Sequence, residues 1–293
     1  MAQIAPQLPH DRPSAASRRG SSPARAVVVT GINGRPPPLW RELLLVFVFY
    51  GAYTITRLIL SPTGTAPAFS HAADILSLER ALGLDVELGL NKALVAAPWL
   101  ARTANVFYAT AHFVVTLGVL VWLYRRRPAH YRRLRAALMA ATAIALAGFW
   151  LCPLAPPRLI GQGYVDPVTA LHTFGLYSGH ASAELTNQFA AMPSMHAGWA
   201  LWCGLVLIRL GRRTWVRVLG AGYPVLTVLV ILSTANHYLL DAVAGTLIVI
   251  ATLTASWQLH RGILLKKESG LIREVGHKLT TPPSIGDMPN AGV

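Results

Sequence analysis

Six apolar stretches constrain the fold of this 293-residue chain more than any other feature. They lie at about residues 39–60, 102–124, 134–152, 193–210, 216–233 and 238–259. Each is close to the roughly 20 apolar residues that a helix needs to cross a bilayer. Charged residues make up only 13% of the chain, against roughly 25% in soluble domains. We therefore expect an all-α integral membrane protein with six transmembrane helices.

The segments around these stretches predict the remaining organisation. Residues 1–36 are rich in Pro, Arg, Ser and Gly, a composition typical of a disordered arm. Residues 37–260 would then form the membrane domain, and residues 261–293 a cytoplasmic tail. Within the domain, apolar residues recur at helical spacing over about 71–82 and stop at Gly83. This pattern predicts an amphipathic helix that lies on the outer membrane face.

The basic residues fall almost entirely on one side of a six-span topology. Of 26 Lys and Arg residues, all but five lie in the N-terminal arm and the adjoining edge of the first span, in the loops after the second and fourth spans, or in the tail. The five exceptions are Arg57, Arg80, Lys92, Arg102 and Arg158. Because cytoplasmic segments carry the excess of Lys and Arg, we expect both termini in the cytoplasm and the protein in the plasma membrane. The net charge of +14 then reflects the orientation of the chain in the membrane, and nucleic acid is not an expected partner.

Two short polar motifs open the fourth and sixth spans. They are Met192-Pro193-Ser194-Met195-His196 and Asn236-His237-Tyr238-Leu239-Leu240-Asp241. In this topology both lie at the extracytoplasmic face. Ionisable residues within membrane segments are costly and usually functional. The two motifs therefore predict an active site that faces the extracytoplasmic side.

Further polar residues are expected at the same end. The second span begins outside and carries Asn105, Tyr108 and His112, whose spacings of three and four place them on one helical face. Substrate contact and interhelical hydrogen bonding are equally good interpretations of these three. Arg158 follows the third span in Pro156-Pro157-Arg158 and is expected nearby.

These residue types suggest phosphoryl transfer. An Asp beside a His fixes its tautomer and stabilises the imidazolium, so His237 with Asp241 predicts an activated nucleophile. His196 can exchange a proton with the leaving or entering oxygen. Ser194, the helix N-terminus behind it and Arg158 can bind phosphate. The alternatives are a structural His237–Asp241 pair, a simple N-cap for Ser194 and a solvated loop charge for Arg158.

The motifs resemble those of the type 2 phosphatidic acid phosphatase superfamily, and more closely its branch of inositol phosphorylceramide synthases. The resemblance covers roughly residues 68–245 and is carried by Pro193-Ser194-Met195-His196, by His237-Tyr238-Leu239-Leu240-Asp241, by Asn105-Val106-Phe107-Tyr108 with His112, and by Pro156-Pro157-Arg158. It implies a six-helix core, a lipid phosphate or phospholipid substrate, and no required metal or other cofactor. His237 would attack phosphorus and become phosphohistidine, and His196 would protonate the leaving alkoxide. We expect Asn236, just before the nucleophile, among the substrate-binding residues.

The sequence also departs from the wider superfamily at three positions. Leu151 occupies the position of a superfamily Lys that precedes the Arg matching Arg158. Ile231 occupies the position of a superfamily Arg that precedes the final His, and Met195 occupies the position of a Gly. Two cations are therefore missing from the expected phosphate cradle. Fewer positive charges suit a phosphodiester better than a dianionic phosphomonoester.

Two rival interpretations use the same residues. His196, His237 and Asp241 are the types that form a two-His, one-carboxylate zinc site. A transporter would use Asp241 and the histidines as a proton relay, although transporter sites lie near the bilayer midplane. The interpretation that we favour is a lipid phosphotransferase with a phosphoinositol-type donor and a hydroxyl or water acceptor. A polyprenyl or phosphatidate phosphatase is the alternative of the same chemical class.

Overall fold

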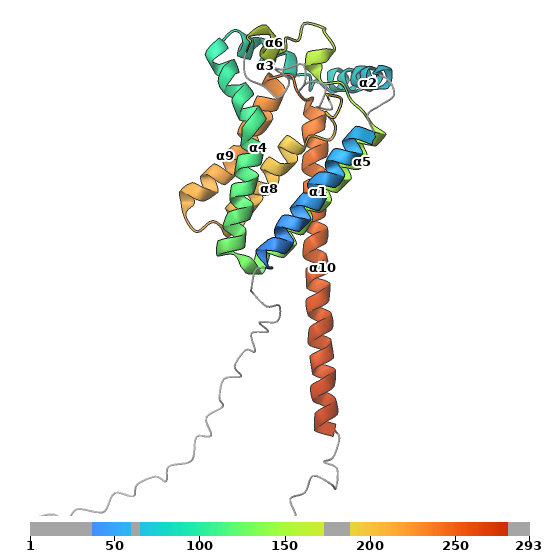
Figure 1. Cartoon of the computed structure of the whole chain (residues 1–293), viewed down its shortest axis with the longest axis vertical. Helices are drawn as coiled ribbons and strands as arrows, with labels where there is room; N and C mark the ends of the chain where they lie inside the picture. Colours follow the sequence, from blue (N-terminus) through green and yellow to red (C-terminus); the bar gives the residue numbers. More distant parts are fainter. Residues whose placement is uncertain (1–36, 60–64, 173–187, 281–293) are drawn as a thin grey trace, which may run out of the picture. The chain divides into compact units, whose positions relative to one another are not determined.

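The computed structural model describes residues 37–59, 65–172 and 188–280. The predicted arm at 1–36 and residues 281–293 of the predicted tail lie outside the described residues. Regular secondary structure in the described part is helical, and one isolated parallel bridge joins Leu154 to Ala190. The helices are α1 (Leu39–Ile59), α2 (Ala66–Leu82), α3 (Glu87–Val95), α4 (Pro98–Arg126), α5 (Pro128–Leu151), η1 (Pro157–Leu159), α6 (Pro167–Ala170), α8 (Met195–Leu210), α9 (Thr214–Ser233) and α10 (Leu239–Thr280) (Figure 1).

Each of the six predicted spans coincides with a helix, namely α1, α4, α5, α8, α9 and α10. Among the described residues, four segments are long and apolar enough to cross a membrane: α4, α5, α9 and Leu239–Gly270 of α10. Helix α8 is also apolar, but its 16 residues are fewer than a full span needs. The all-helical membrane character is thus confirmed for four segments, and the count of six stays a prediction.

The last helix does not end where the sixth predicted span ends. Helix α10 continues through residues 261–280, the first part of the predicted tail. The physical reason is the absence of a strong helix stop, because the first prolines after residue 259 are Pro282 and Pro283 and isolated glycines cost a helix only about 1 kcal/mol each. Helix α10 thus crosses residue 260 without a break, and the division of the chain at that residue into a membrane domain and a cytoplasmic tail stays a prediction.

The segment before α4 folds into two helices. Helix α2 begins at Ala66, earlier than the predicted start near residue 71, and ends as predicted at Gly83, which adopts a left-handed conformation with φ of 68°. Its buried residues are Ala68, Ala72, Leu76 and Glu79. Helix α3 follows at once, and Figure 1 shows α2 and α3 at the same end of the bundle as the start of α10. The location of α2 on a membrane surface stays a prediction.

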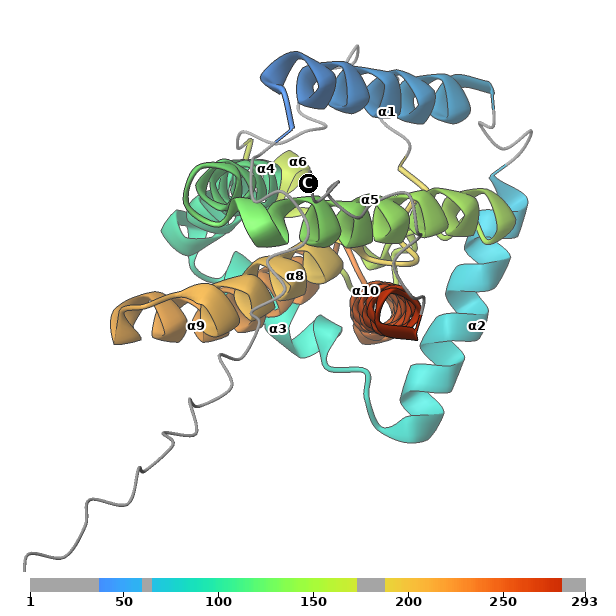
Figure 2. The same cartoon turned by 90° about the horizontal axis from the view of Figure 1, so that it is seen from below.

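Helices α8, α9 and α10 approach one another closely at glycines. A Cβ atom at Gly204 of α8 would lie 2.5 Å from the carbonyl oxygen of Gly220 on α9. A Cβ atom at Gly198 of α8 would lie 3.0 Å from the carbonyl oxygen of Gly245 on α10. Small residues allow membrane helices to bring their backbones together in this way. Figure 2 shows α8 passing beside both partners.

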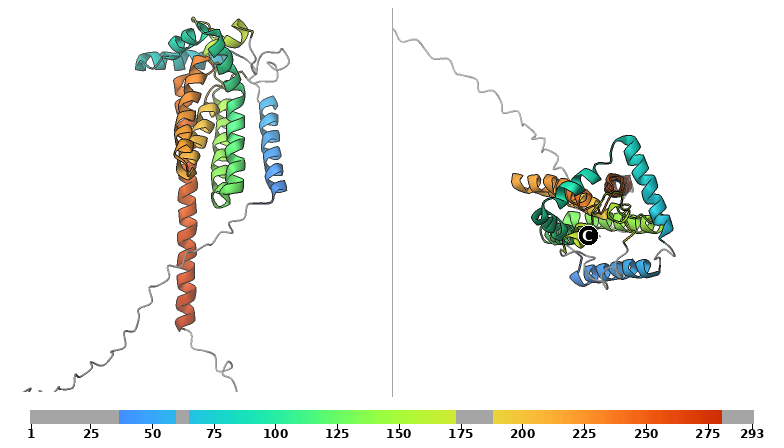
Figure 3. Two further views of the ribbon diagram at one scale, coloured as in Figure 1. Left: turned by 90° about the vertical axis from the view of Figure 1, so that its left-hand side faces the viewer. Right: turned by 90° about the horizontal axis from the view of Figure 1, so that it is seen from above.

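Helix α1 is attached to the bundle by a polar contact at its N-terminal end. The buried carboxylate of Glu42 forms an ion pair with Arg135 of α5 and accepts a hydrogen bond of 2.8 Å from the Tyr131 hydroxyl. The Tyr124 hydroxyl of α4 donates to the carbonyl oxygen of Pro37 at 2.9 Å. Figure 3 shows α1 as a separate helix along the bundle, so these contacts fix its register.

Alanine at two glycines of α9 should have opposite effects on stability. A Cβ atom at Gly220 would lie 2.9 Å from Cβ of Leu207, whereas one at Gly222 would have nothing within 4 Å. We expect Gly220→Ala to lower the free energy of unfolding by roughly 1–3 kcal/mol through overpacking. Gly222→Ala should be neutral or stabilising, because Ala favours a helix by about 1 kcal/mol over Gly. Thermal unfolding in detergent measures both, and equal midpoints would contradict the close α8–α9 contact.

Candidate active site

The turn between α9 and α10 holds His237 in place. The backbone N–H groups of Asn236 and His237 both donate to the carbonyl oxygen of Ile231, at 3.1 and 3.3 Å. Ala235 has a φ of 54°, a left-handed conformation that costs a residue with a side chain roughly 1–2 kcal/mol. Its carbonyl oxygen accepts a hydrogen bond from the N–H of Arg158 at 2.9 Å. The turn is therefore fixed from both sides just before His237.

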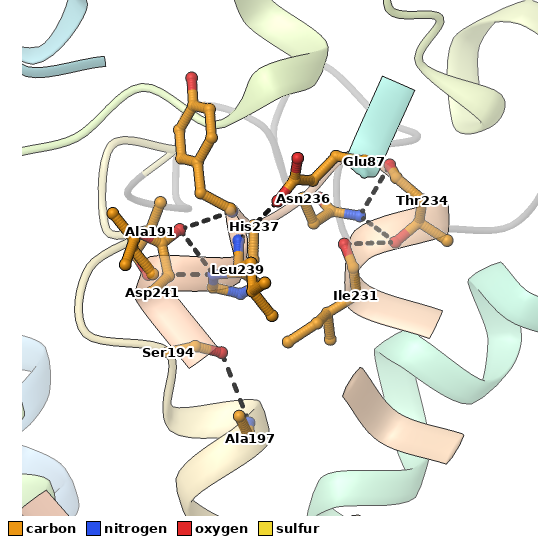
Figure 4. Close-up of polar contacts among 12 residues, drawn as sticks. Glu87, Ala191, Ser194, Ala197, Ile231, Thr234, Asn236, His237, Leu239 and Asp241 are labelled. Carbon is orange, nitrogen blue, oxygen red and sulfur yellow. Dashed lines mark hydrogen bonds and ion pairs between the residues drawn. The ribbon is translucent and has the colours of Figure 1, made fainter. Parts of the chain in front are cut away.

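The ring of His237 is oriented by two oxygen atoms. Its Nδ1 lies 2.9 Å from the carbonyl oxygen of Ala191 and 3.4 Å from Oδ2 of Asp241 (Figure 4). A carbonyl oxygen can only accept, so Nδ1 carries the hydrogen and Nε2 keeps its lone pair. The predicted pairing of His237 with Asp241 is present, but the closer partner is a backbone carbonyl.

Asp241 joins the two polar motifs. Its Oδ2 accepts a hydrogen bond of 2.9 Å from the N–H of Tyr238, just before α10 begins. Its backbone oxygen accepts another of 2.9 Å from the N–H of Ser194, just before α8 begins. His237 itself lies ahead of α10 rather than within it. The contact with Asp241 therefore arises because the turn folds back over the first residues of the helix.

Ser194 acts as the N-cap of α8. Its Oγ accepts a hydrogen bond of 3.4 Å from the N–H of Ala197, and the residue is fully buried. A Cβ atom at Gly245 of α10 would collide with the carbonyl oxygen of Ser194. Since the N–H of Ser194 is bonded to Asp241, these contacts fit the capping alternative, and the predicted phosphate contact of Ser194 stays a prediction.

His196 lies within a cluster of rings from α4 and α8. It stacks on Tyr108 with ring centroids 4.3 Å apart, meets His112 edge-on at 4.2 Å, and lies 5.5 Å from the ring of His237. Its Nε2 is buried and has no hydrogen-bond partner among the described residues. The structure therefore brings both predicted catalytic histidines together and leaves this nitrogen of His196 available.

Two of the three polar residues of α4, Tyr108 and His112, face this cluster. Nδ1 of His112 lies 3.1 Å from the carbonyl oxygen of Tyr108, and both rings contact His196. Asn105 is also buried, with 2% of its surface exposed. For Tyr108 and His112, contact between helices is thus present, and their predicted substrate contact stays a prediction.

Arg158 is linked to Asn236, the residue before His237. Its Nε donates to Oδ1 of Asn236 at 2.9 Å. Its Nη1 lies 3.7 Å from Oδ2 of Asp166 and 3.4 Å from Oε1 of Gln188. The side chain is buried rather than a solvated loop charge. Asp166 and Gln188 were not predicted, because nothing in the sequence around them indicates a contact with Arg158.

The two positions that lack the expected cations differ in environment. Leu151, the last residue of α5, has 70% of its surface exposed, whereas Ile231 of α9 is buried in the hydrophobic core with 1% exposed. A charge at Ile231 would require removal of a packed side chain. Of the three cations of the expected phosphate cradle, this chain keeps Arg158, and Arg158 is paired with the carboxylate of Asp166.

Two buried glutamates that sequence reasoning missed lie at the start of α10. Glu87 of α3 accepts a hydrogen bond from the N–H of Leu239 through Oε1, and Glu79 of α2 accepts one from the N–H of Leu240, both at 2.7 Å. Neither glutamate is exposed. A signal existed for Glu79, since it continues the helical stripe of Ala68, Ala72 and Leu76 that α2 buries. Burial, together with the charges of Glu87 and Asp241, raises the pKa of Glu79 to about 8, and burial also raises that of Glu87.

The arrangement brings together the groups that a two-step transfer would use. Nε2 of His237 is the candidate nucleophile, with its ring held at Nδ1, His196 is a second imidazole nearby, and Arg158 is a cation next to Asn236. No group of three or more His, Cys, Asp or Glu side chains in the described part of the chain is arranged to hold a metal ion. The alternative zinc site at His196, His237 and Asp241 is therefore not supported by the geometry.

One family model matches the chain across this region. It is described as the PAP2 superfamily and covers residues 73–255, more than half of the chain. The matched segment includes both polar motifs, Arg158 and the two buried glutamates. No curated protein and no solved structure matches the chain.

Replacement of Arg158 by lysine should weaken the binding of a phosphate group. Lysine keeps the charge but has no Nε–H to donate to Asn236 and no planar fork for an anion. A lost hydrogen bond to a charged group is worth about 1.5–3 kcal/mol, so we expect at least about a tenfold lower affinity for inorganic phosphate. Calorimetric titration of the purified protein measures this. Arg80→Lys is the control, because Arg80 is exposed and its guanidinium contacts the side chains of Gln162 and Asp85 rather than Asn236. Equal losses in both variants would contradict a specific role for Arg158.

Proposed function

The chain belongs to the PAP2 superfamily, and on that premise we propose that it is a membrane-embedded lipid phosphotransferase or phosphatase that acts through a phosphohistidine on His237. Membership supports phosphoric ester chemistry on lipid-like substrates. The observation that carries the proposal is the contact of 2.9 Å between Nδ1 of His237 and the carbonyl oxygen of Ala191. It leaves Nε2 as the nucleophilic atom next to a second imidazole.

In the first step, Nε2 of His237 attacks phosphorus and the bond from phosphorus to the leaving alkoxide breaks. His196 donates the proton that this alkoxide takes up, which lowers the barrier to its departure. The positive charge that develops on His237 is stabilised by the oxygens of Ala191 and Asp241 facing Nδ1. The guanidinium of Arg158 supplies donors for the non-bridging oxygens.

In the second step, His196 takes a proton from the acceptor hydroxyl or from water. The acceptor oxygen bonds to phosphorus, the bond between phosphorus and Nε2 breaks, and His237 returns to its neutral form. His196 thus alternates between acid and base, and no proton is gained or lost over the cycle. The buried Nε2 of His196, which has no partner in the described part of the chain, supports this role.

We favour a phosphodiester donor of the phosphoinositol type, as in the inositol phosphorylceramide synthases that the motifs resemble. Support comes from the charge balance, because Arg158 lies 3.7 Å from the carboxylate of Asp166 and the two further cations of the wider superfamily are absent at Leu151 and Ile231. A phosphodiester carries one negative charge where a monoester carries up to two. The proposal includes cytoplasmic termini and a site at the extracytoplasmic face of the plasma membrane, supported by the distribution of Lys and Arg.

Two histidine variants should separate the two catalytic roles. His237→Ala should abolish turnover and the acid-labile phosphoenzyme, since no nucleophile remains. His196→Ala should slow release of a lipid alkoxide by roughly 10²–10⁴-fold, but should retain much more activity with a nitrophenyl ester, whose leaving group needs no proton. Turnover with both ester types and phosphoenzyme trapping measure this, and His172→Ala, in an exposed residue, is the control. A purified His237→Ala protein with normal turnover would overturn the mechanism.

The fate of a labelled headgroup should distinguish a transferase from a phosphatase. We expect radiolabel from phosphatidylinositol to appear on a lipid alcohol supplied as acceptor, because a phosphodiester donor leaves the headgroup attached to phosphorus in the phosphoenzyme. Phosphatidic acid with the same acceptor is the comparison donor. Free phosphate from phosphatidic acid without transfer from either donor would contradict the transferase and favour the lipid phosphatase.

A further inference from the structure

Three consecutive backbone N–H groups at the start of α10 are bound by three carboxylates from three helices. The N–H of Tyr238 donates to Asp241 of α10 itself, that of Leu239 to Glu87 of α3, and that of Leu240 to Glu79 of α2. The distances are 2.9, 2.7 and 2.7 Å, and Figure 4 shows Glu87 and Asp241 on the two sides of this turn. These are the first three N–H groups after His237.

We propose that Glu79 and Glu87 are positioning residues for His237, which fix the backbone directly after the nucleophile and so aim its Nε2. The inference rests on the proposed function of His237 and adds two residues from helices outside the two motifs. Neither glutamate needs to touch the substrate for this role. Both act through the peptide units of Leu239 and Leu240, which are the second and third residues after His237.

Capping of a helix does not by itself require such residues. A Ser, Thr, Asn or Asp at the N-cap contributes about 1 kcal/mol, and Asp241 already bonds the N–H of Tyr238. Glu79 and Glu87 are instead fully buried, and each has one carboxylate oxygen without a partner among the described residues. Burial of unpaired carboxylate oxygens is costly, and the helix dipole offsets only part of that cost. What the two glutamates add is a rigid connection from α2 and α3 to the residues that follow His237.

The three carboxylates at the start of α10 influence one another's ionisation. Besides burial, the charge of Glu87 raises the pKa of Glu79, and the carboxylate of Asp241 adds a further like charge to both glutamates. The other titratable or charged groups that face them are Asp85, Arg80, Tyr164 and Tyr238. Because burial raises the pKa of Glu79 from 4.5 to about 8, this carboxyl group is protonated at neutral pH.

The sign of the pH dependence follows from this raised pKa. The folded state binds a proton on Glu79 that the unfolded chain releases above its pKa of 4.5. The stability that the protonated form contributes is therefore complete below about pH 4.5 and is lost as the pH rises towards 8. Above pH 8 the ionised Glu79 adds a further negative charge beside Glu87 and Asp241, and the repulsion among these carboxylates loosens the start of α10. We expect an alkaline limb in kcat near pH 8 that originates from Glu79.

The decisive comparison is between Glu79→Gln and Glu79→Ala. Glutamine imitates the protonated acid, because its side-chain oxygen can accept the hydrogen bond from the N–H of Leu240 and its amide does not ionise. We expect Glu79→Ala to lower kcat by about 10- to 100-fold, the cost of a small misplacement of a catalytic group, with KM within about threefold. Glu79→Gln should restore most of that loss and remove the alkaline limb. Asp74→Asn is the control, because Asp74 is an exposed acid in the same helix.

A substrate-free measurement accompanies turnover. The rate at which diethyl pyrocarbonate modifies His237, followed by peptide mass spectrometry, reports the accessibility and tautomer of the ring in the folded protein. We expect this rate to change in Glu79→Ala and to return to the wild-type value in Glu79→Gln. If Glu79→Ala does not fold, the pH profile of Glu79→Gln still decides the question.

The outcomes separate the two proposals. A folded Glu79→Ala with wild-type kcat and wild-type modification of His237 would overturn the positioning role. So would a Glu79→Gln variant that keeps the alkaline limb unchanged. A wild-type protein that turns over no lipid phosphate would refute the proposed function, and the modification rates would then still confirm or refute the effect of Glu79 on His237.

Discussion

The site depends on one backbone hydrogen bond, from the N–H of Ser194 to the carbonyl oxygen of Asp241. It joins the starts of α8 and α10, which carry the two polar motifs and are far apart in the sequence. The bond requires the two helices to approach so closely that Gly245 has no room for a side chain beside Ser194. With these starts joined, Ala191 comes within hydrogen-bond distance of His237, and His196 faces its ring. The same backbone contact therefore determines both the packing of α8 against α10 and the positions of Ala191 and His196 around His237.

The end of the protein that holds His237 contains more carboxylates than the proposed phosphoryl transfer requires. Three carboxylates lie at the start of α10, and Asp166 pairs with Arg158. The positive end of the α10 dipole is thereby directed at protein carboxylates rather than at a free anion. Arg158, the cation proposed to bind the phosphate group, already has an acidic neighbour, and this pairing is the basis of the proposed singly charged phosphodiester donor. The same balance explains why a large net positive charge for the whole chain says little about the site.

The length of the apolar stretches predicted the helices. The spacing of polar residues along one helical face predicted that the motifs would lie close together. His196, His237, Asp241, Tyr108 and His112 were placed together on that basis, and the ring contacts agree. The contact of the Ala191 carbonyl with His237 could not be predicted from the sequence, because every residue has a backbone carbonyl group. Glu79 and Glu87 were missed because their partners lie in α10, more than 150 residues away for each bond. The extension of α10 was missed because hydropathy marks where a membrane segment ends, whereas helix termination depends on stop signals.

Helix α10 is one unbroken element of 42 residues, which at 1.5 Å per residue is roughly 63 Å long. The hydrocarbon core of a bilayer is only about 30 Å thick. Leu239 and Thr280 are therefore the two ends of one continuous helix that is longer than the membrane is thick. Because α10 is continuous from Leu239 to Thr280, the tilt of this helix in a bilayer also sets the direction of its first turn, which follows shortly after His237.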